Sequence, residues 1–158
     1  MKAVANLGSE TELSKEDSKS NSRIAEVKVE RSVFERKRIW KVRIEGDDEL
    51  VINTSEIDLK PNDILMTDKG LKVVVRSKEE PLVTFDLRDP VEAFALGFNL
   101  GNMHAQTMLE EQSKRIATPA LLGWEFYKQR FSKYKPQLKS GVFIQNVQAM
   151  AGDLESPA

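Results

Sequence analysis

Hydrophobic and polar residues alternate along much of the first half of the chain. The alternation runs from residues 25 to 33, from 40 to 44 and from 71 to 75. A period of two is typical of a strand with one buried face. Further short strands are expected at residues 1–8 and from residue 50 onward, and short apolar pieces next to turns occupy residues 57–59 and 64–66. Several short strands separated by turns predict a small all-β domain of the barrel or sandwich kind.

The second half has a different pattern, which predicts the order β-α-β-β-α-β. The expected strands are 82–87, 106–110 and 115–117, with a last strand or a buried extension at 142–147, and the expected helices are 90–103 and 118–132. This order is that of the ferredoxin-like split βαβ arrangement. The fold class that we predict is therefore α+β, with an all-β domain followed by a ferredoxin-like domain.

Composition along the chain predicts the domain boundaries. A charged break at 76–80 separates a β-rich domain, residues 1–76, from a second domain, residues 81–148. Residues 9–22 are polar and without periodicity, and we expect a long loop there. We expect a mobile tail at 149–158.

The first helix of the second domain has a clear N-terminal signal. Asp89 is suited to cap it, Pro90 fits the first helical position, and Glu92 completes an Asp-x-x-Glu capping box.

This helix carries two apolar stripes. At 100° per residue one stripe contains Val91, Phe94, Ala95 and Phe98, which we interpret as the core face. Leu96, Leu100 and Met103 form a second stripe roughly opposite, and Gly97 and Gly101, which lie between the stripes, complete a second set with them. A helix with two apolar faces is either enclosed in its own domain or shared with another chain. We expect the second set to form the interface of a homodimer, because each glycine costs about 1 kcal/mol of helix propensity unless close approach compensates.

The only histidine, His104, follows this helix on the side of the glycines. In a twofold dimer one histidine per chain becomes two near the axis. Two facing imidazoles form half of a metal site of the kind that nickel, copper or zinc accept.

A similar choice of faces arises for the helix at 118–132, where Thr118 is the expected cap and Pro119 lies in the first turn. We assign one stripe to the core, and this stripe consists of Ala120, Trp124, Tyr127 and Phe131. Leu122 and Phe126 then lie on another side, where they meet a partner or pack against residues 142–144.

Composition narrows the classes of function. The net charge is −1, 31% of the residues are charged and 40% are hydrophobic, so we expect a globular protein without general attraction to nucleic acid or membranes. No apolar run reaches the length of about 18 residues that a membrane helix needs, and no signal-peptide pattern is present, so we expect the cytoplasm. Without cysteine and with one histidine, an enzyme is not expected; Asp86 and Asp89 are better explained as a strand end and a helix cap.

The segment Leu100-Gly101-Asn102-Met103-His104 resembles the Leu-Gly-Asn-Arg-His signature of the UreE family, the nickel chaperones of urease assembly. The resemblance implies that His104 binds Ni(II) at a dimer interface, with Zn(II) or Cu(II) as further ions bound in vitro. It also implies the urease accessory GTPase and the apo-urease complex as partners. Met103 stands in place of the family's arginine.

A second motif supports the same resemblance. Residues 59–65 are similar to the family's Leu-x-x-Gly-Asp-x-Leu turn, with Asn62 in place of glycine. Asparagine tolerates a positive φ better than most residues, so we expect the turn to persist. In the family this domain contacts partner proteins.

The chain lacks the histidine-rich tail of many family members. Two imidazoles and waters would hold an ion loosely, which suits a carrier, and uptake should fall below about pH 6 because protons compete for histidine. The alternative is a dimeric adaptor of the same fold that binds no metal, which the missing histidines and Met103 favour.

Overall fold

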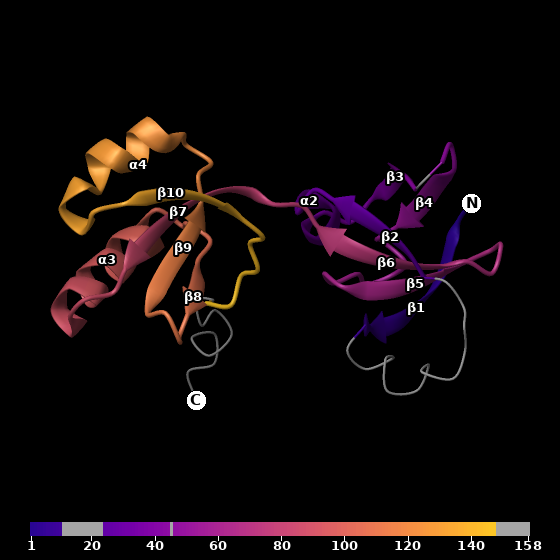
Figure 1. The fold of residues 1–158 in the computed structure, drawn as a ribbon, viewed down its shortest axis with the longest axis horizontal. Helices are drawn as coiled ribbons and strands as arrows, with labels where there is room; N and C mark the ends of the chain where they lie inside the picture. The colour runs from indigo at the N-terminus through magenta and orange to yellow at the C-terminus, as the bar shows by residue number, and fades with distance from the viewer. Residues whose placement is uncertain (11–23, 45, 148–158) are drawn as a thin grey trace, which may run out of the picture. The chain divides into compact units, whose positions relative to one another are not determined.

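The computed structural model describes residues 1–10, 24–44 and 46–147. It is an α+β structure with several small sheets and three helices among these residues, and the chain divides into two compact units, Met1–Lys78 and Glu79–Ala158 (Figure 1). The division falls within the charged segment 76–80. The loop expected at 9–22, apart from its first two residues, and the tail expected at 149–158 lie outside the described residues. None of the described helices is long and apolar enough to cross a membrane.

The first unit contains two sheets. One has the order β1-β5-β6-β2 and the other pairs β3 with β4. The strands are β1 (Ala3–Ser9), β2 (Ile24–Val29), β3 (Ile39–Arg43), β4 (Glu49–Asn53), β5 (Asp63–Thr67) and β6 (Lys72–Ser77). Strand β2 pairs with β6 in parallel, and the other pairs are antiparallel. Both sheets contribute to one core, which includes Val27, Leu50, Ile52, Leu65 and Val73.

One strand prediction in this unit was wrong. The strand expected over 25–33 ends at Val29, and helix α2 (Ser32–Glu35) follows. Val33 is buried on this helix, and its N–H donates to the carbonyl of Glu30. One turn of helix can therefore bury the same valine that the alternation assigned to a strand. The apolar piece at 57–59 lies in a turn region, where the N–H of Ile57 donates to the carbonyl of Asn53.

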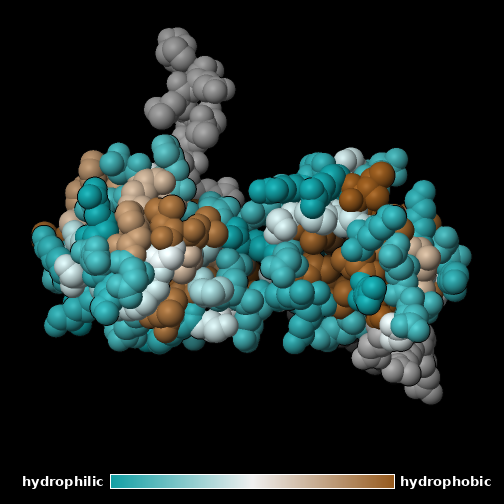
Figure 2. Space-filling model, turned by 90° about the horizontal axis from the view of Figure 1, so that it is seen from above, coloured by the Kyte–Doolittle hydropathy of each residue, from teal (hydrophilic) through white to brown (hydrophobic). Residues whose placement is uncertain are grey.

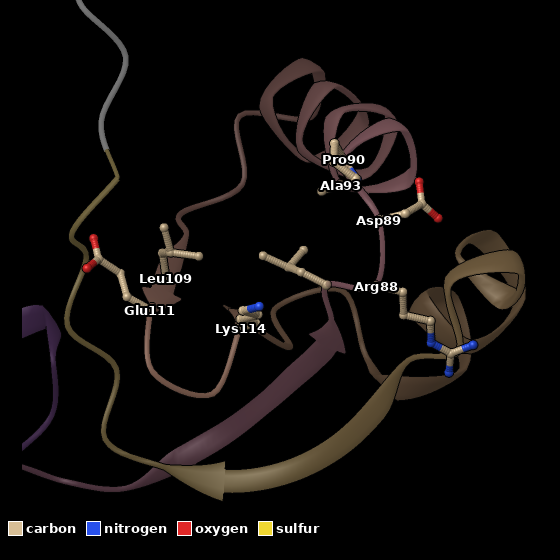
Figure 3. A pocket seen from close by; sticks show the side chains of 8 residues that line it. Arg88, Asp89, Pro90, Ala93, Leu109, Glu111 and Lys114 are labelled. Atoms are coloured by element: carbon tan, nitrogen blue, oxygen red, sulfur yellow. The ribbon is translucent and has the colours of Figure 1, made fainter.

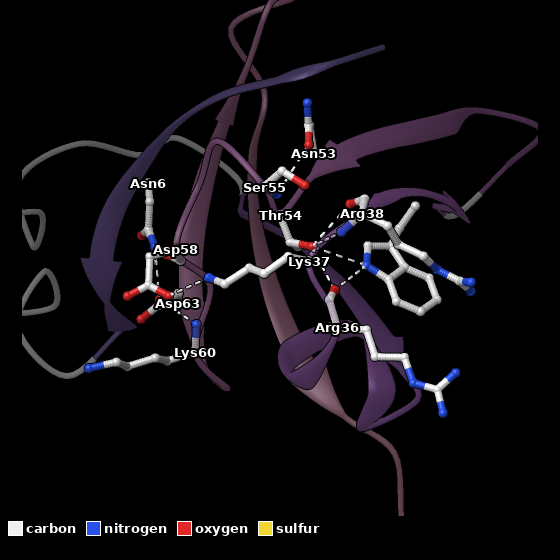
Figure 4. A network of polar contacts seen from close by, with 11 residues as sticks. Asn6, Arg36, Lys37, Arg38, Asn53, Thr54, Ser55, Asp58, Lys60 and Asp63 are labelled. Carbon is white, nitrogen blue, oxygen red and sulfur yellow. Dashed lines mark hydrogen bonds and ion pairs between the residues drawn. The ribbon is translucent and has the colours of Figure 1, made fainter. Parts of the chain in front are cut away.

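The turn predicted around Asn62 is present. Asn62 has φ of 69°, the left-handed value for which asparagine was expected to substitute for glycine. The buried carboxylate of Asp63 accepts bonds from the N–H of Lys60 (2.9 Å) and the side-chain amide of Asn6 (2.8 Å), as Figure 4 shows. The aspartate of this motif therefore fixes the turn and ties it to β1.

The second unit has one antiparallel sheet with the order β10-β7-β9-β8. Along the chain the elements follow the order β-α-β-β-α-β, with a short 3₁₀ turn before the last strand. They are β7 (Glu80–Asp86), α3 (Pro90–Asn102), β8 (Met108–Glu110), β9 (Arg115–Pro119), α4 (Trp124–Arg130), η1 (Ser132–Tyr134) and β10 (Gln137–Gly141).

Helices α3 and α4 cover one face of this sheet. Val83 and Phe85 of β7 form a core with Leu96 and Leu100 of α3 and with two aromatic residues, Tyr127 and Phe131. On the other face Leu82 and Ala117 pack against Phe143, which follows β10. The alternation of side chains along β7 therefore separates a helical layer from a layer made by the segment after β10.

Two element predictions in this unit were wrong. Thr118 and Pro119 do not begin a helix: they end β9, where Thr118 pairs with Val83, and α4 begins later, after Gly123 with φ of 85°. The last strand is 137–141 rather than 142–147.

The core stripe predicted on the second helix was correct. Tyr127 and Phe131 are buried, and Ala120 and Trp124 pack against the same core. Leu122 remains 58% exposed.

Candidate functional site at the end of α3

The start of α3 agrees with the sequence. Asp89 has an extended backbone, its carboxylate accepts a bond of 2.8 Å from the N–H of Glu92, and Pro90 occupies the first turn. The signal that was clearest in the sequence therefore fixes where this helix begins.

The two faces of α3 are the reverse of those predicted. Leu96 and Leu100 are 2% and 1% exposed in the chain's own core, and Met103 packs against the same core. Leu96 and Leu100 therefore have almost no surface to contribute to the dimer interface to which we assigned them, whereas Met103 is only partly buried. The supposed core stripe instead faces outward, with Val91 at 79%, Phe94 at 74% and Phe98 at 66% exposure. Periodicity defines two stripes, but the connection from β7 decides which one faces the sheet.

Gly97 and Gly101, the remaining residues of the predicted interface, are exposed. A Cβ atom added to either would meet no atom within 4 Å. Nothing within the chain therefore requires a glycine at these positions, although each costs about 1 kcal/mol of helix propensity. The rings of Phe94 and Phe98 lie beside each other, with centroids 6.3 Å apart. Together these four residues form an exposed surface, which we call the Phe-Gly face.

His104 ends the helix in a strained conformation. Its φ is 55°, its N–H donates to the carbonyl of Gly101, and the N–H of Ala105 donates to that of Leu100. These two bonds form a Schellman motif, in which the left-handed position is usually glycine. A histidine at this position costs about 1 kcal/mol, and such strain is commonly retained where a side chain has a function.

The exposed His104 lies at a groove of about 400 Å³. The groove is also lined by both glycines of the Phe-Gly face and, among others, by Gln106, Thr107 and Gln145. The amide of Gln106 approaches that of Gln145 at 3.5 Å. Among the described residues, no three histidine, cysteine or acidic side chains are grouped so that they could hold a metal ion. Among the described residues, His104 is therefore a single nitrogen ligand beside the neutral oxygen donors of this groove.

A second groove, of about 370 Å³, lies where α3 begins (Figure 3). Leu87, Pro90 and Leu109 contribute to its apolar lining. The charged ends of Arg88 and Asp89 point away from Leu109. Glu111 and Lys114 are the other charged residues of its lining.

Compared with known proteins, the sequence matches no family model and no curated protein. Support for a function therefore comes from the geometry around α3 and from the residues of the 100–104 motif. One signal in the sequence shows with which stripe Gly101 is grouped, although it does not show which stripe faces the sheet. At 100° per residue, Gly101 lies only about 20° from Phe94 but about 100° from Leu100. Gly101 is thus continuous with the phenylalanines, whereas Gly97 lies about 60° from both Phe94 and Leu100.

Proposed function

We propose that the protein is a homodimeric metal carrier that holds one Ni(II) ion between the His104 side chains of two copies. The observation that carries this proposal is the Phe-Gly face, an exposed apolar surface that ends at an exposed histidine. Apolar surfaces of this kind on a helix mark interaction sites. A twofold pairing of the same face on two chains would bring both histidines to one axis.

The position of His104 limits how two α3 helices can pair. For antiparallel helices that cross at Gly101, the two His104 Cα atoms are separated by about 9 Å along the axis, because the helix rises 1.5 Å per residue. A crossing at Gly97 increases that separation to about 21 Å, too far for two imidazoles on one ion. The proposed dimer therefore has its closest approach at Gly101, where a missing Cβ allows the backbones to meet.

The chemistry of such a site suits transport. Two neutral imidazoles, completed by waters or by amide oxygens such as that of Gln145, fit the borderline ions nickel, copper and zinc. Because few protein ligands hold the ion, it can be released to a recipient protein. Copper binds such ligands more tightly than nickel, so selectivity would come from metal availability and from the recipient.

The assignment to urease assembly rests on the resemblance of residues 100–104 to the UreE signature. The sheet order β10-β7-β9-β8, with both helices on one face, supports the ferredoxin-like arrangement that the resemblance implies. In this proposal the protein acts in the cytoplasm, and the recipients are the urease accessory GTPase and the apo-urease complex.

The test is nickel stoichiometry measured together with solution mass. We expect half an ion per chain in a dimer, affinity that falls below about pH 6 because protons displace the metal, and no binding by the His104→Gly variant. Asp153 and Glu155 provide a control, because removal of these two carboxylates should leave binding unchanged. One ion per monomer, or equal binding by His104→Gly, would refute the shared site.

A metal-free adaptor is the second candidate. It is favoured because His104 belongs to no group of three histidine, cysteine or acidic side chains among the described residues, and because Met103 packs against the chain's own core. A dimer that binds nickel no better than His104→Gly does would support the adaptor.

A further inference from the structure

The first unit has an open strand edge that the proposed nickel site does not use. Strand β3 pairs only with β4, and β2 pairs only with β6, so no ladder joins β2 to β3 among the described strands. A groove of about 370 Å³ lies between these two strands. The fold therefore leaves one seam open in this unit.

The backbone of β3 offers regularly spaced bonding groups to this seam. The carbonyl of Arg38 accepts from Thr54 and the N–H of Ile44 donates to Asp48, so the even-numbered residues of the strand face β4. Bonding groups alternate sides along an antiparallel strand. The N–H and C=O groups of Ile39, Lys41 and Arg43 consequently point toward the open edge, where no described residue bonds the N–H of Lys41.

The groove has an apolar floor and a basic rim. Its apolar lining comprises Val27, Val29, Val33, Trp40 and Val42. Figure 2, seen from the side on which β3 and β4 lie in Figure 1, shows hydrophobic side chains recessed between hydrophilic ones on this unit. The charged lining residues are four cations, Lys28, Lys41, Arg43 and Lys78, and one anion, Glu30.

The excess of positive charge is available to a ligand. Glu30 is paired with Lys78 at 3.4 Å, whereas Lys41 and Arg43 form no ion pair with any residue that the structure describes. The chain as a whole has a net charge of −1, so this concentration of cations is local. It is complementary to an acidic partner.

The edge is also held in shape. The hydroxyl of Thr54 accepts from the indole N–H of Trp40 (3.2 Å) and from the N–H of Arg38 (3.0 Å), as Figure 4 shows. The guanidinium of Arg38 lies 3.8 Å from the centre of the Trp40 ring. One end of β3 and the aromatic part of the floor are thus ordered before any ligand binds, which lowers the entropic cost of binding.

We propose that the open edge of β3 binds an extended acidic segment of a partner protein by strand addition. The segment pairs its backbone with Ile39, Lys41 and Arg43, places apolar side chains against the valines and Trp40, and sets acidic side chains beside Lys41 and Arg43. Main-chain bonds supply affinity in this mode of recognition, and alternate side chains supply specificity.

The probe is a capped synthetic peptide that alternates valine and glutamate, added to the full-length protein. Hydrogen exchange should show new protection at the amides of Ile39, Lys41 and Arg43 and little change at Trp40 and Val42, which already bond β4. In a Trp124→Phe background, fluorescence of Trp40 should report the same binding. Methylating the peptide amides on one edge should abolish binding, and methylating those on the other edge should not.

Charge is tested with matched variants. The double variant Lys41→Glu and Arg43→Glu should weaken binding about tenfold or more, because two attractive cross-strand pairs become repulsive. Lys60→Glu with Lys69→Glu changes the net charge equally at exposed sites elsewhere in the same unit, and it should bind like the native chain.

Four outcomes would overturn the proposal. Equal binding of a valine-lysine peptide would remove the acidic specificity, and equal binding of both methylated peptides would remove strand pairing. Tighter binding of a ten-residue oligothymidine would identify a nucleic-acid surface. If no probe binds, the cations serve only to keep an exposed edge from pairing with other chains.

Discussion

Replacement of His104 by glycine separates the structural cost of this residue from its function. His104 has φ of 55° at the left-handed position of a Schellman motif. A non-glycine residue there is disfavoured by about 1 kcal/mol, and part of the gain from glycine is offset by its larger freedom in the unfolded chain. We therefore expect His104→Gly to raise the free energy of unfolding of the second unit by about 0.5–1 kcal/mol.

The assay is thermal unfolding without nickel at one protein concentration, followed through Trp124 in a Trp40→Phe background so that the second unit is observed alone. For a unit of this size the expected increase in Tm is roughly 3–6 °C. His104→Ala keeps a Cβ in the left-handed region and should change Tm little. Both variants should lose nickel binding.

The comparison of these two variants decides the argument. If glycine lowers Tm, or if alanine and glycine behave alike, the strain assigned to His104 is absent. If glycine stabilises the unit and nickel binding persists, the strain is real but His104 is not the ligand. Only a His104→Gly variant that is more stable and no longer binds nickel fits a histidine that is retained for metal binding although it destabilises the fold.

Three further predictions concern other parts of the molecule. Phe98→Glu should dissociate the proposed dimer in sedimentation or light-scattering measurements while the monomer stays folded. The reason is that burying the exposed two-thirds of the Phe98 side chain contributes about 3 kcal/mol per copy to dimer formation. A dimer that persists in this variant would exclude the Phe-Gly face as the dimer interface. Leu100→Ala should destabilise the second unit by about 2–5 kcal/mol in denaturant unfolding, because the side chain is fully buried, whereas an interface residue would show its effect only in the dimer. Arg76 donates a hydrogen bond of 2.8 Å to Glu26 and lowers the pKa of that carboxyl, so Arg76→Gln should raise the Glu26 pKa toward its ordinary value in an NMR titration. The stability that this pair contributes is present above the unfolded-state pKa of Glu26 and is lost as the pH falls through its folded-state pKa. An unchanged Glu26 titration in the variant would contradict the assigned cause.

The local signals of the sequence were sufficient where the chemistry is local. The cap at Asp89, the positive φ of Asn62 and the alternating strands of the first unit follow from interactions between residues close in the chain. Backbone sterics and nearby hydrogen bonds decide such features, and they act in much the same way in any fold.

Errors arose where an apolar residue had two ways to become buried. Val33 continued an alternating pattern but is buried by one turn of helix, and Thr118 with Pro119 read as a helix start but complete a strand. In each case a pairing partner distant in the chain, or the lack of one, made the choice. The difference in free energy between helix and strand propensity of a residue is smaller than the free energy that such tertiary interactions contribute.

What the sequence by itself determined about the site is the presence of an apolar helix with two faces, two glycines and a histidine at its end. Only the tertiary structure decided that the leucines face the sheet and the phenylalanines face outward, and that His104 adopts a left-handed conformation beside a groove. The physical reason is that the period of a helix fixes the angles between its side chains, whereas the orientation of the whole helix depends on the sheet that it covers and on the connection from β7.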